Sequence, residues 1–352
     1  MSKLRFLVLP CLLLIAALCS AQSTQMNLPL QSQAAKVTQT IGITNITIDY
    51  HRPLVNGRKV WGGLVPYGQV WRAGANLNTT ITFANDVTVE GKPLPAGTYG
   101  LHMIPNENDW TVIFSNMHTA WGSFSYKESE DALRVTVKPQ PTEMHNALTY
   151  DFDQLQPDSA VVVMSWDKVA VPFKVSVDVN KIVNASLQNQ LRGLSQYTWD
   201  GWDDAATYLV DSKYDLPEAL KWEDNSIGQE DRFENEMTKS RILDAMGQKT
   251  EAQQAKDKAL ALGNAQQLYG YGRQLQREGK QQDAFAVFKQ AAQKDPNNWL
   301  SHAGLARVAV GAGNYSEATK QLQMALAVAP DSGKPSVQGL LTKVQDKQDI
   351  NK

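Results

Sequence analysis

Cysteine is nearly absent from this sequence. The chain has 352 residues and 2 cysteines, Cys11 and Cys19, both close to its start. No disulfide can therefore form among the residues that follow, and those residues must be held by apolar cores and hydrogen bonds. A chain of this length can bury enough surface when it divides into domains of ordinary size. The small disulfide-rich class of extracellular protein is thereby excluded.

Long apolar runs are scarce as well. The one clear run, residues 6–18, follows Lys3 and Arg5 and precedes small residues that end at Ala21. About 13 residues are too few for a membrane-spanning helix, which needs ~20, and this order of features is typical of a secretory signal. We therefore expect residues 1–21 to be a cleaved signal peptide, the protein to be periplasmic or secreted, and no membrane span to remain after cleavage.

A lipid anchor at Cys19 is the alternative for the same leader. Such sites carry a small residue just before the cysteine, whereas Leu18 stands there, which argues against lipidation.

An excess of basic charge is also missing, because the formal net charge is −2 and cleavage of the leader would make it about −4. We therefore expect neither nucleic acid nor an anionic membrane as a partner.

Recognisable catalytic motifs are missing too. There is no Gly-x-Ser-x-Gly elbow, phosphate-binding loop or His-Glu-x-x-His, and no thiol after the leader. A Ser-x-x-Lys match at Ser165 and Lys168 is read as chance, because Ser165 ends a predicted strand. We predict no catalytic residue and no cofactor. A metal site is a weaker alternative, since only the fold could gather the scattered histidines His51, His102, His118 and His145.

What residues 27–179 do contain is alternation with a period of two. Apolar and polar residues alternate over 46–50, 133–137 and 173–179, which is typical of strands with one buried face. Further short β-rich runs separated by turn residues bring the total to nine or more. These are 79–83, 87–89, 97–103, 110–114, 148–152 and 160–166. The pattern favours an antiparallel β-sandwich and leaves a closed barrel open.

One segment, residues 51–78, lacks this alternation. Long unpatterned loops in compact domains are often functional, and this one combines arginine, aromatic and amide side chains that suit a carboxylate, a phosphate or a sugar. The alternative is that its tryptophans fill the core and its arginines pair with carboxylates or carbonyls. The candidate ligand-binding residues are Arg52, Arg58, Trp61, Tyr67, Trp71, Arg72, Asn76 and Asn78.

The motifs of this region resemble a known family. They are Arg52-Pro53, the run at 57–68 with Trp61 at its centre, the run at 70–76, and Pro-Ala-Gly-Thr-Tyr-Gly-Leu at 95–101. Residues 27–179 are similar to the bacterial domain-of-unknown-function family 2911. The resemblance implies an exported β-rich domain and carries no activity with it.

After residue 180 the composition shifts to alanine, glutamine, leucine, lysine and glutamate, which favour helices. Comparison at an offset of about 34 residues reveals a repeat that resembles the tetratricopeptide pattern of two antiparallel helices. The first copy, 265–298, is defined by Leu268, Tyr271, Gly272, Leu275, Ala284, Phe288, Ala291 and Pro296. The second, 299–332, is defined by His302 with Leu305, Ala306, Ala309, Ala318, Leu322, Ala325 and Pro330.

Two repeats seldom close a core, so upstream residues must add more helical pairs. We predict an array over 190–343 with seven or eight helices, followed by a polar tail at 344–352. Such arrays bind peptides or protein surfaces. Aromatic residues near its start either line a groove or pack the first repeat against the β-rich domain, and helical spacing favours packing. They are Trp199, Trp202, Tyr208, Tyr214 and Trp222.

Two hypotheses follow for function. The first is an exported, non-enzymatic binding or scaffolding protein, in which the repeats hold a protein partner and the β-rich domain holds an unknown ligand or second partner. The alternative is a hydrolase or carbohydrate-active β domain that works through the loop at 51–78.

Overall fold

The computed structural model describes residues 28–351, so the expected signal peptide at 1–21 lies outside the described part. The chain divides between Val179 and Asn180 into two compact units, which we call the β unit and the repeat unit. Within the described residues, no helix combines the length and apolar character that a membrane span requires.

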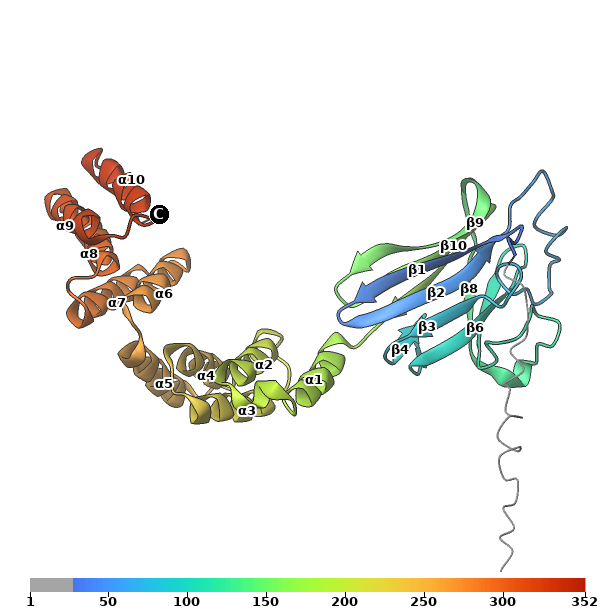
Figure 1. Cartoon of the computed structure of the whole chain (residues 1–352), viewed down its shortest axis with the longest axis horizontal. Helices are drawn as coiled ribbons and strands as arrows, with labels where there is room; N and C mark the ends of the chain where they lie inside the picture. Colours follow the sequence, from blue (N-terminus) through green and yellow to red (C-terminus); the bar gives the residue numbers. More distant parts are fainter. Residues whose placement is uncertain (1–27, 352) are drawn as a thin grey trace, which may run out of the picture. The chain divides into compact units, whose positions relative to one another are not determined.

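The β unit consists of two antiparallel sheets (Figure 1). The larger has the strand order β1-β2-β3-β6-β7-β8. Its strands are Gln33–Ile41 (β1), Thr44–Arg52 (β2), Thr80–Phe83 (β3), Gly97–Ile104 (β6), Trp110–Ser115 (β7) and Asp131–Val137 (β8). The smaller has the order β5-β4-β10-β9. Its strands are Val87–Val89 (β4), Lys92–Leu94 (β5), Gln140–Gln156 (β9) and Ser159–Ser176 (β10).

Side chains from the two sheets meet in one core. Phe114 of β7 lies edge-on to Phe173 of β10 with ring centroids 5.8 Å apart, and both are fully buried. Alternation explains this packing, because residues two apart on a strand point to the same face. On β2, for example, Ile46, Ile48 and Tyr50 are buried between exposed or half-buried neighbours. The expected β-sandwich is confirmed.

The strand boundaries differ from the sequence-based ones at β10. The two expected strands at 160–166 and 173–179 are one long strand that ends at Ser176. Register shifts flank Asp167, whose φ of 56° marks the irregularity. A bulge of this kind bends a strand without ending its pairing, so the break in alternation near 167 is no strand end.

The repeat unit contains ten α-helices within the described residues, against the seven or eight expected. Antiparallel pairs α2–α3, α4–α5, α6–α7 and α8–α9 pack side by side (Figure 1). The additional helices are α1 and α10, at the two ends of the array. The bounds are Val179–Gln190 (α1), Trp199–Asp211 (α2), Leu216–Gln229 (α3), Phe233–Ala245 (α4), Lys249–Leu262 (α5), Ala265–Arg277 (α6), Gln281–Lys294 (α7), Trp299–Gly311 (α8), Tyr315–Val328 (α9) and Lys334–Gln345 (α10).

The repeat-defining residues form the interfaces between these helices. A Cβ on Gly272 would stand 2.3 Å from the Phe288 ring, so α6 and α7 can approach closely only because this position is glycine. Pro296 and Pro330 follow the ends of α7 and α9, where no backbone donor is needed. The buried members are Leu268, Gly272, Leu275, Ala284, Phe288, Ala291, His302, Ala306, Ala309, Ala318, Leu322 and Ala325, whereas Tyr271 and Leu305 are half-buried.

The early aromatic residues pack within the repeat unit. Trp222 is buried, and Trp202, Tyr208 and Tyr214 lie against the same apolar cluster of α2 and α3. Trp199 lies under the guanidinium of Arg232, 4.7 Å from its ring centroid. Packing, rather than exposure in a groove, accounts for these rings.

The last residues are also held in place. The sequence marks a polar tail from 344 onward, yet α10 continues to Gln345, and Ile350 is only 4% exposed among side chains of α8 and α10. Lys347 has a φ of 54°, and Gln348 donates its backbone N–H to the Lys343 carbonyl. A left-handed residue after a helix reverses the chain, so residues 348–351 run back over the array.

Candidate functional site

The loop at 51–78 is anchored to both sheets of the β unit. Leu54 forms a bridge with Ala147 of β9, and Trp71 forms one with Met103 of β6. The Tyr150 hydroxyl donates to the Ala73 carbonyl at 2.8 Å. An unpatterned stretch of sequence is therefore an ordered part of the sandwich, held by contacts that alternation does not encode.

Tryptophans form the core beneath this loop. Trp61 is 8% exposed and lies edge-on to Trp110 of β7 at 4.7 Å and to Trp166 of β10 at 5.7 Å. Trp71 stacks on Trp166 at 5.8 Å. Aromatic pairs at these separations add to the free energy gained by burial. Trp61 therefore fills the space between the sheets and is not available to a ligand.

The three loop arginines do not converge on one point. Arg52 donates from Nε to the Leu148 carbonyl at 2.9 Å and from Nη2 to Thr149 Oγ1 at 2.8 Å, so β9 holds it. Arg58 donates to the carbonyls of Val55 and Leu54 within the loop itself. The Arg52 guanidinium thus joins the loop to β9, and the Arg58 guanidinium supports the loop backbone.

Arg72 is different, because its Nε is buried and has no hydrogen-bond partner among the described residues. Its guanidinium carbon lies 5.7 Å from the centroid of the Trp121 ring. Burial lowers the pKa of Arg72 from its ordinary value. A buried donor without a partner costs free energy that a bound acceptor would recover.

Arg72 lines a cavity of about 380 Å³, which we call the loop cavity. Half of the eight candidate residues line it: Arg58, Trp71, Arg72 and Asn76. Asn76 is oriented by its Nδ2, which donates to the Ser32 carbonyl at 3.1 Å. Arg52, Trp61, Tyr67 and Asn78 are not among its lining residues. The loop thus brings together part of the candidate set.

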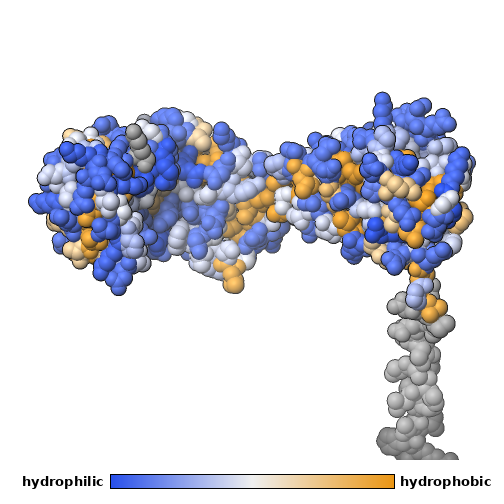
Figure 2. Space-filling model, turned by 90° about the horizontal axis from the view of Figure 1, so that it is seen from above, coloured by the Kyte–Doolittle hydropathy of each residue, from blue (hydrophilic) through white to orange (hydrophobic). Residues whose placement is uncertain are grey.

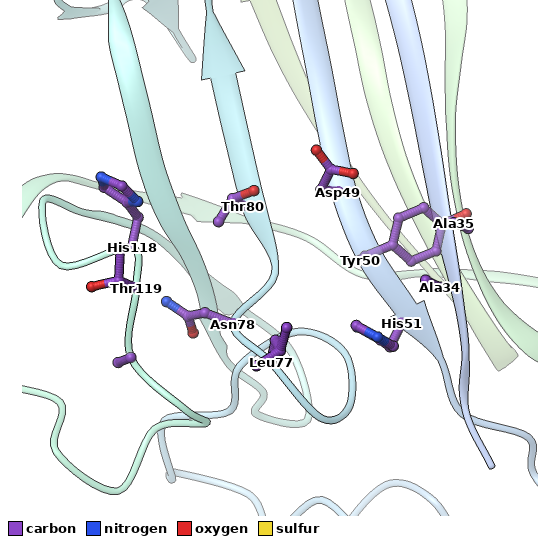
Figure 3. A pocket seen from close by; sticks show the side chains of 11 residues that line it. Ala34, Ala35, Asp49, Tyr50, His51, Leu77, Asn78, Thr80, His118 and Thr119 are labelled. Atoms are coloured by element: carbon purple, nitrogen blue, oxygen red, sulfur yellow. The ribbon is translucent and has the colours of Figure 1, made fainter. Parts of the chain in front are cut away.

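Asn78 belongs to a second cavity of about 320 Å³, the strand pocket, which β1, β2, the start of β3 and residues 118–120 line (Figure 3). Asn78 is 7% exposed, and its Nδ2 donates to the Met117 carbonyl at 3.3 Å. Its Oδ1 is buried with no partner among the described residues. His51 and His118 line the same pocket from different elements (Figure 3), and burial lowers the pKa of His51.

The other two histidines lie elsewhere. His102 is 2% exposed, and its Nδ1 is 2.9 Å from Ser123 Oγ. Burial lowers the pKa of His102 to about 4, with Asp131 opposing the shift. His145 pairs with Asp167 in the β9–β10 ladder. Within residues 28–351 no group of three histidine, cysteine or acidic residues is placed to hold a metal ion.

Sequence reasoning missed two exposed aromatic residues near Arg72. Trp121 and Phe124 stack at 5.8 Å and are 62% and 83% exposed, beside Arg72. On the face shown in Figure 2, apolar residues form several patches on the β unit. Two exposed aromatic residues three apart in a segment without alternation were the available signal. Their proximity to Arg72 depends on long-range folding and could not be inferred.

The repeat unit has a larger hollow of about 720 Å³, lined by α4, α5, α6 and adjoining turns. Lys213, Lys256, Lys249, Arg241 and Lys280 line it, with Asp244 and Glu278 as the acidic lining residues. Lys249 and Lys280 form ion pairs with these two carboxylates. The Lys256 ammonium lies 5.8 Å from the Tyr271 ring centroid. The lining therefore carries a net positive charge.

Two family models match this chain. Residues 32–175 match the family described as Protein of unknown function (DUF2911). Residues 275–344 match a tetratricopeptide repeat. This match covers all ten strands except Ser176, the last residue of β10. It also covers every lining residue of the two cavities except Gln31. No curated protein matches the chain.

Solved structures resemble parts of the chain at low similarity. A chain of the APC/C hetero-tetramer Cut9-Hcn1 is 15% identical over 46% of this chain and 32% of its own, with a TM-score of 0.30. YrrB, described as a TPR protein with an unusual peptide-binding site, is 15% identical over 47% of this chain and 86% of its own, with a TM-score of 0.28. Pseudomonas aeruginosa pilF is 18% identical over 42% of this chain and 70% of its own, with a TM-score of 0.28.

Proposed function

We propose that this protein is an exported, non-enzymatic binding protein whose repeat unit holds a protein partner and whose β unit holds a small ligand. Stacked helical pairs leave extended surfaces that suit another protein. The tetratricopeptide match at 275–344 supports this role for the repeat unit. Export rests on the leader at 1–21.

The hollow of the repeat unit carries the proposal. Its volume of about 720 Å³ and its excess of lysine and arginine suit a partner surface that offers carboxylates. Lys256 and Lys213 form no ion pair with any described residue. The charge of Lys256 acts on Glu278, but the ion pair of that carboxylate is with Lys280. An acidic side chain of the partner would supply a direct ion pair.

Affinity capture from envelope extract tests this role. The full chain is compared with Lys256→Glu, which reverses a charge in the hollow, and with Lys320→Glu, an exposed residue of α9 outside it. We expect a stoichiometric partner that Lys256→Glu loses and Lys320→Glu retains. Equal recovery by all three proteins would contradict a role for the hollow. Fusion of residues 1–27 to an export reporter tests the leader separately.

A ligand site in the loop cavity is the second candidate function, as a carbohydrate-active or ligand-binding domain. The observation that favours it is the Nε of Arg72, which has no hydrogen-bond partner within residues 28–351 and lies beside Trp71 and Trp121. A guanidinium next to aromatic faces suits a sugar acid or another carboxylate. Binding raises the melting temperature by mass action.

A thermal-shift screen of sugars, sugar acids, cell-wall fragments and divalent metals tests the loop cavity. We expect at least one anionic sugar to raise the melting temperature of the full chain, and the shift to disappear in Arg72→Ala. Lys138→Ala, an exposed change just after β8, serves as the control. A flat screen with the parent chain would reject this function.

A further inference from the structure

The segment that follows α10 lies on side chains of α6 and α8. The Gln276 Nε2 of α6 donates to Asn351 Oδ1 at 2.7 Å, and Asn351 Nδ2 donates to the Arg307 carbonyl of α8 at 3.0 Å. Arg307 Nη1 donates to the Ile350 carbonyl. In Figure 1 the red end of the chain lies beside α8 and α10, on the side of α6.

Ile350 anchors this segment, which we call the tail (residues 347–351). Its side chain is 4% exposed and packs with Val310 of α8 and Val344 of α10. The tail therefore combines one buried aliphatic side chain, one backbone carbonyl bound by arginine, and one side-chain amide bound at both ends. An extended peptide held by a protein surface makes this combination of contacts.

The surface under the tail carries arginine side chains whose positive charge the tail does not neutralise. Arg307 is 5% exposed, and its Nε donates to the Tyr269 hydroxyl at 3.1 Å. Arg273 stands near enough to Arg307 and Arg277 for their charges to lower its pKa, after the larger effect of burial. Within residues 28–351 no carboxylate forms an ion pair with these three arginines.

A buried guanidinium without a carboxylate partner is costly, and an acidic ligand would stabilise it. The tail also leaves room beside it. A cavity of about 440 Å³ is lined by Asp349 and Asn351 together with residues of α7, α8 and α9. The surface could therefore accept a longer or more acidic segment than the one that now covers it.

We propose that the face formed by α6 and α8 around Gln276, Tyr269 and Arg307 is a peptide-binding site, which the tail fills until a partner peptide displaces it. The peptide it takes is extended and acidic, with an aliphatic residue followed by asparagine in the place of Ile350-Asn351. The inference rests on the proposed function, since the peptide belongs to a protein partner, and it adds a second site to the hollow.

Displacement is feasible because few contacts hold the tail. Its polar contacts to α6 and α8 come from Ile350 and Asn351 alone. Residues 347–349 are exposed. A segment with so few anchors opens at low free energy compared with the helices beneath it. The tail thus acts as a competitor in the same chain, present at a high effective concentration.

Peptide binding to the full chain tests the site. The probe is a fluorescent peptide of sequence Asp-Lys-Gln-Asp-Ile-Asn-Lys, which corresponds to residues 346–352, followed by anisotropy. The parent chain is compared with Asn351→Ala, in which the tail loses its amide contacts. We expect weak binding to the parent and at least tenfold tighter binding to Asn351→Ala.

Gln276→Ala and Arg307→Ala, each added to Asn351→Ala, should weaken the peptide again. Gln276→Ala is included because a buried arginine is harder to remove without unfolding, and circular dichroism checks the fold of each variant. Lys320→Glu added to Asn351→Ala is the control and should leave binding unchanged. Equal affinity of all variants, or no binding to any of them, would overturn the proposal. Neither outcome would bear on capture through Lys256, so the two proposals fail separately.

Discussion

Glu223 lies fully buried on α3 of the repeat unit. Burial, and then the charge of Asp203, raise the pKa of Glu223 to about 9. The folded chain therefore keeps this proton at neutral pH, whereas the unfolded chain releases it near the ordinary value of about 4.5. Because the folded state binds more protons between these two values, the free energy of unfolding falls as the pH rises through that range.

We expect Glu223→Gln to stabilise the repeat unit at pH 8 by about 1–3 kcal/mol and to leave its stability at pH 4 nearly unchanged. The amide keeps the shape of the protonated acid and has no charge to bury. Urea unfolding at several pH values measures the effect, and Glu251→Gln, an exposed change on α5, is the control. A variant that loses stability at pH 8 would contradict this account of Glu223.

The pKa of His102 in the β unit is shifted in the opposite direction, downward. Its pKa of about 4 lies below the ordinary 6.5, so between these values the unfolded chain binds a proton that the folded chain does not. The free energy of unfolding of the β unit should therefore fall as the pH is lowered from 6.5 toward 4. NMR titration should find the His102 imidazole neutral at pH 5.5. Protonation with a midpoint near 6.5 would mean that the ring is not buried in solution.

The role of some residues can be predicted from the sequence, whereas that of Trp61 cannot. Trp61 was open to two interpretations, ligand contact or core, because hydrophobicity alone does not separate them. Its contacts with Trp110 and Trp166 decide for the core. Those partners come from strands β7 and β10, far apart in the sequence, so no local pattern could have joined them.

At the scale of elements, α6 and α7 depend on one glycine. A Cβ at Gly272 would meet Phe288, whereas a Cβ at Gly270, two residues earlier on α6, meets nothing within 4 Å. The same change from glycine to alanine at these two positions alters helix propensity equally, but only at Gly272 does it alter packing. They therefore form a matched pair.

We expect Gly272→Ala to destabilise the repeat unit by about 1–3 kcal/mol through overpacking. Gly270→Ala should stabilise it by up to about 1 kcal/mol, because alanine favours a helix over glycine. Thermal unfolding of the two variants beside the parent measures both. Equal shifts of the same sign would show that close approach of Phe288 does not govern this position.

The helices of the clear repeats were predictable because a periodic pattern recurs at a fixed offset. Helix α1 lies upstream of the recurring pattern. Helix α10 lies almost wholly within the tetratricopeptide match, but it follows the last repeat that the offset of about 34 residues reveals. Both helices cover an end of the array. At β10 the pattern predicts two strands where there is one, since a bulge at Asp167 interrupts alternation without ending the strand. Periodicity thus identifies the type of an element better than its limits.

At the scale of the whole molecule, two units of different construction share one chain, with the division at Val179. The β unit holds two cavities, each with a buried polar atom that has no hydrogen-bond partner in the described part of the chain, Arg72 Nε and Asn78 Oδ1. The repeat unit offers a basic hollow and a face that its own tail covers. These features support our proposal that the β unit binds a ligand and that the repeat unit binds a protein.

The central claim is that a protein partner occupies the hollow of the repeat unit. Site-specific photo-crosslinking in living cells tests it most directly, with the photoreactive residue at Gln253, which is exposed and lines the hollow, and at Lys320 as control. We expect one discrete adduct from position 253 and none from position 320. The same adducts from both positions, or none from position 253, would contradict the claim.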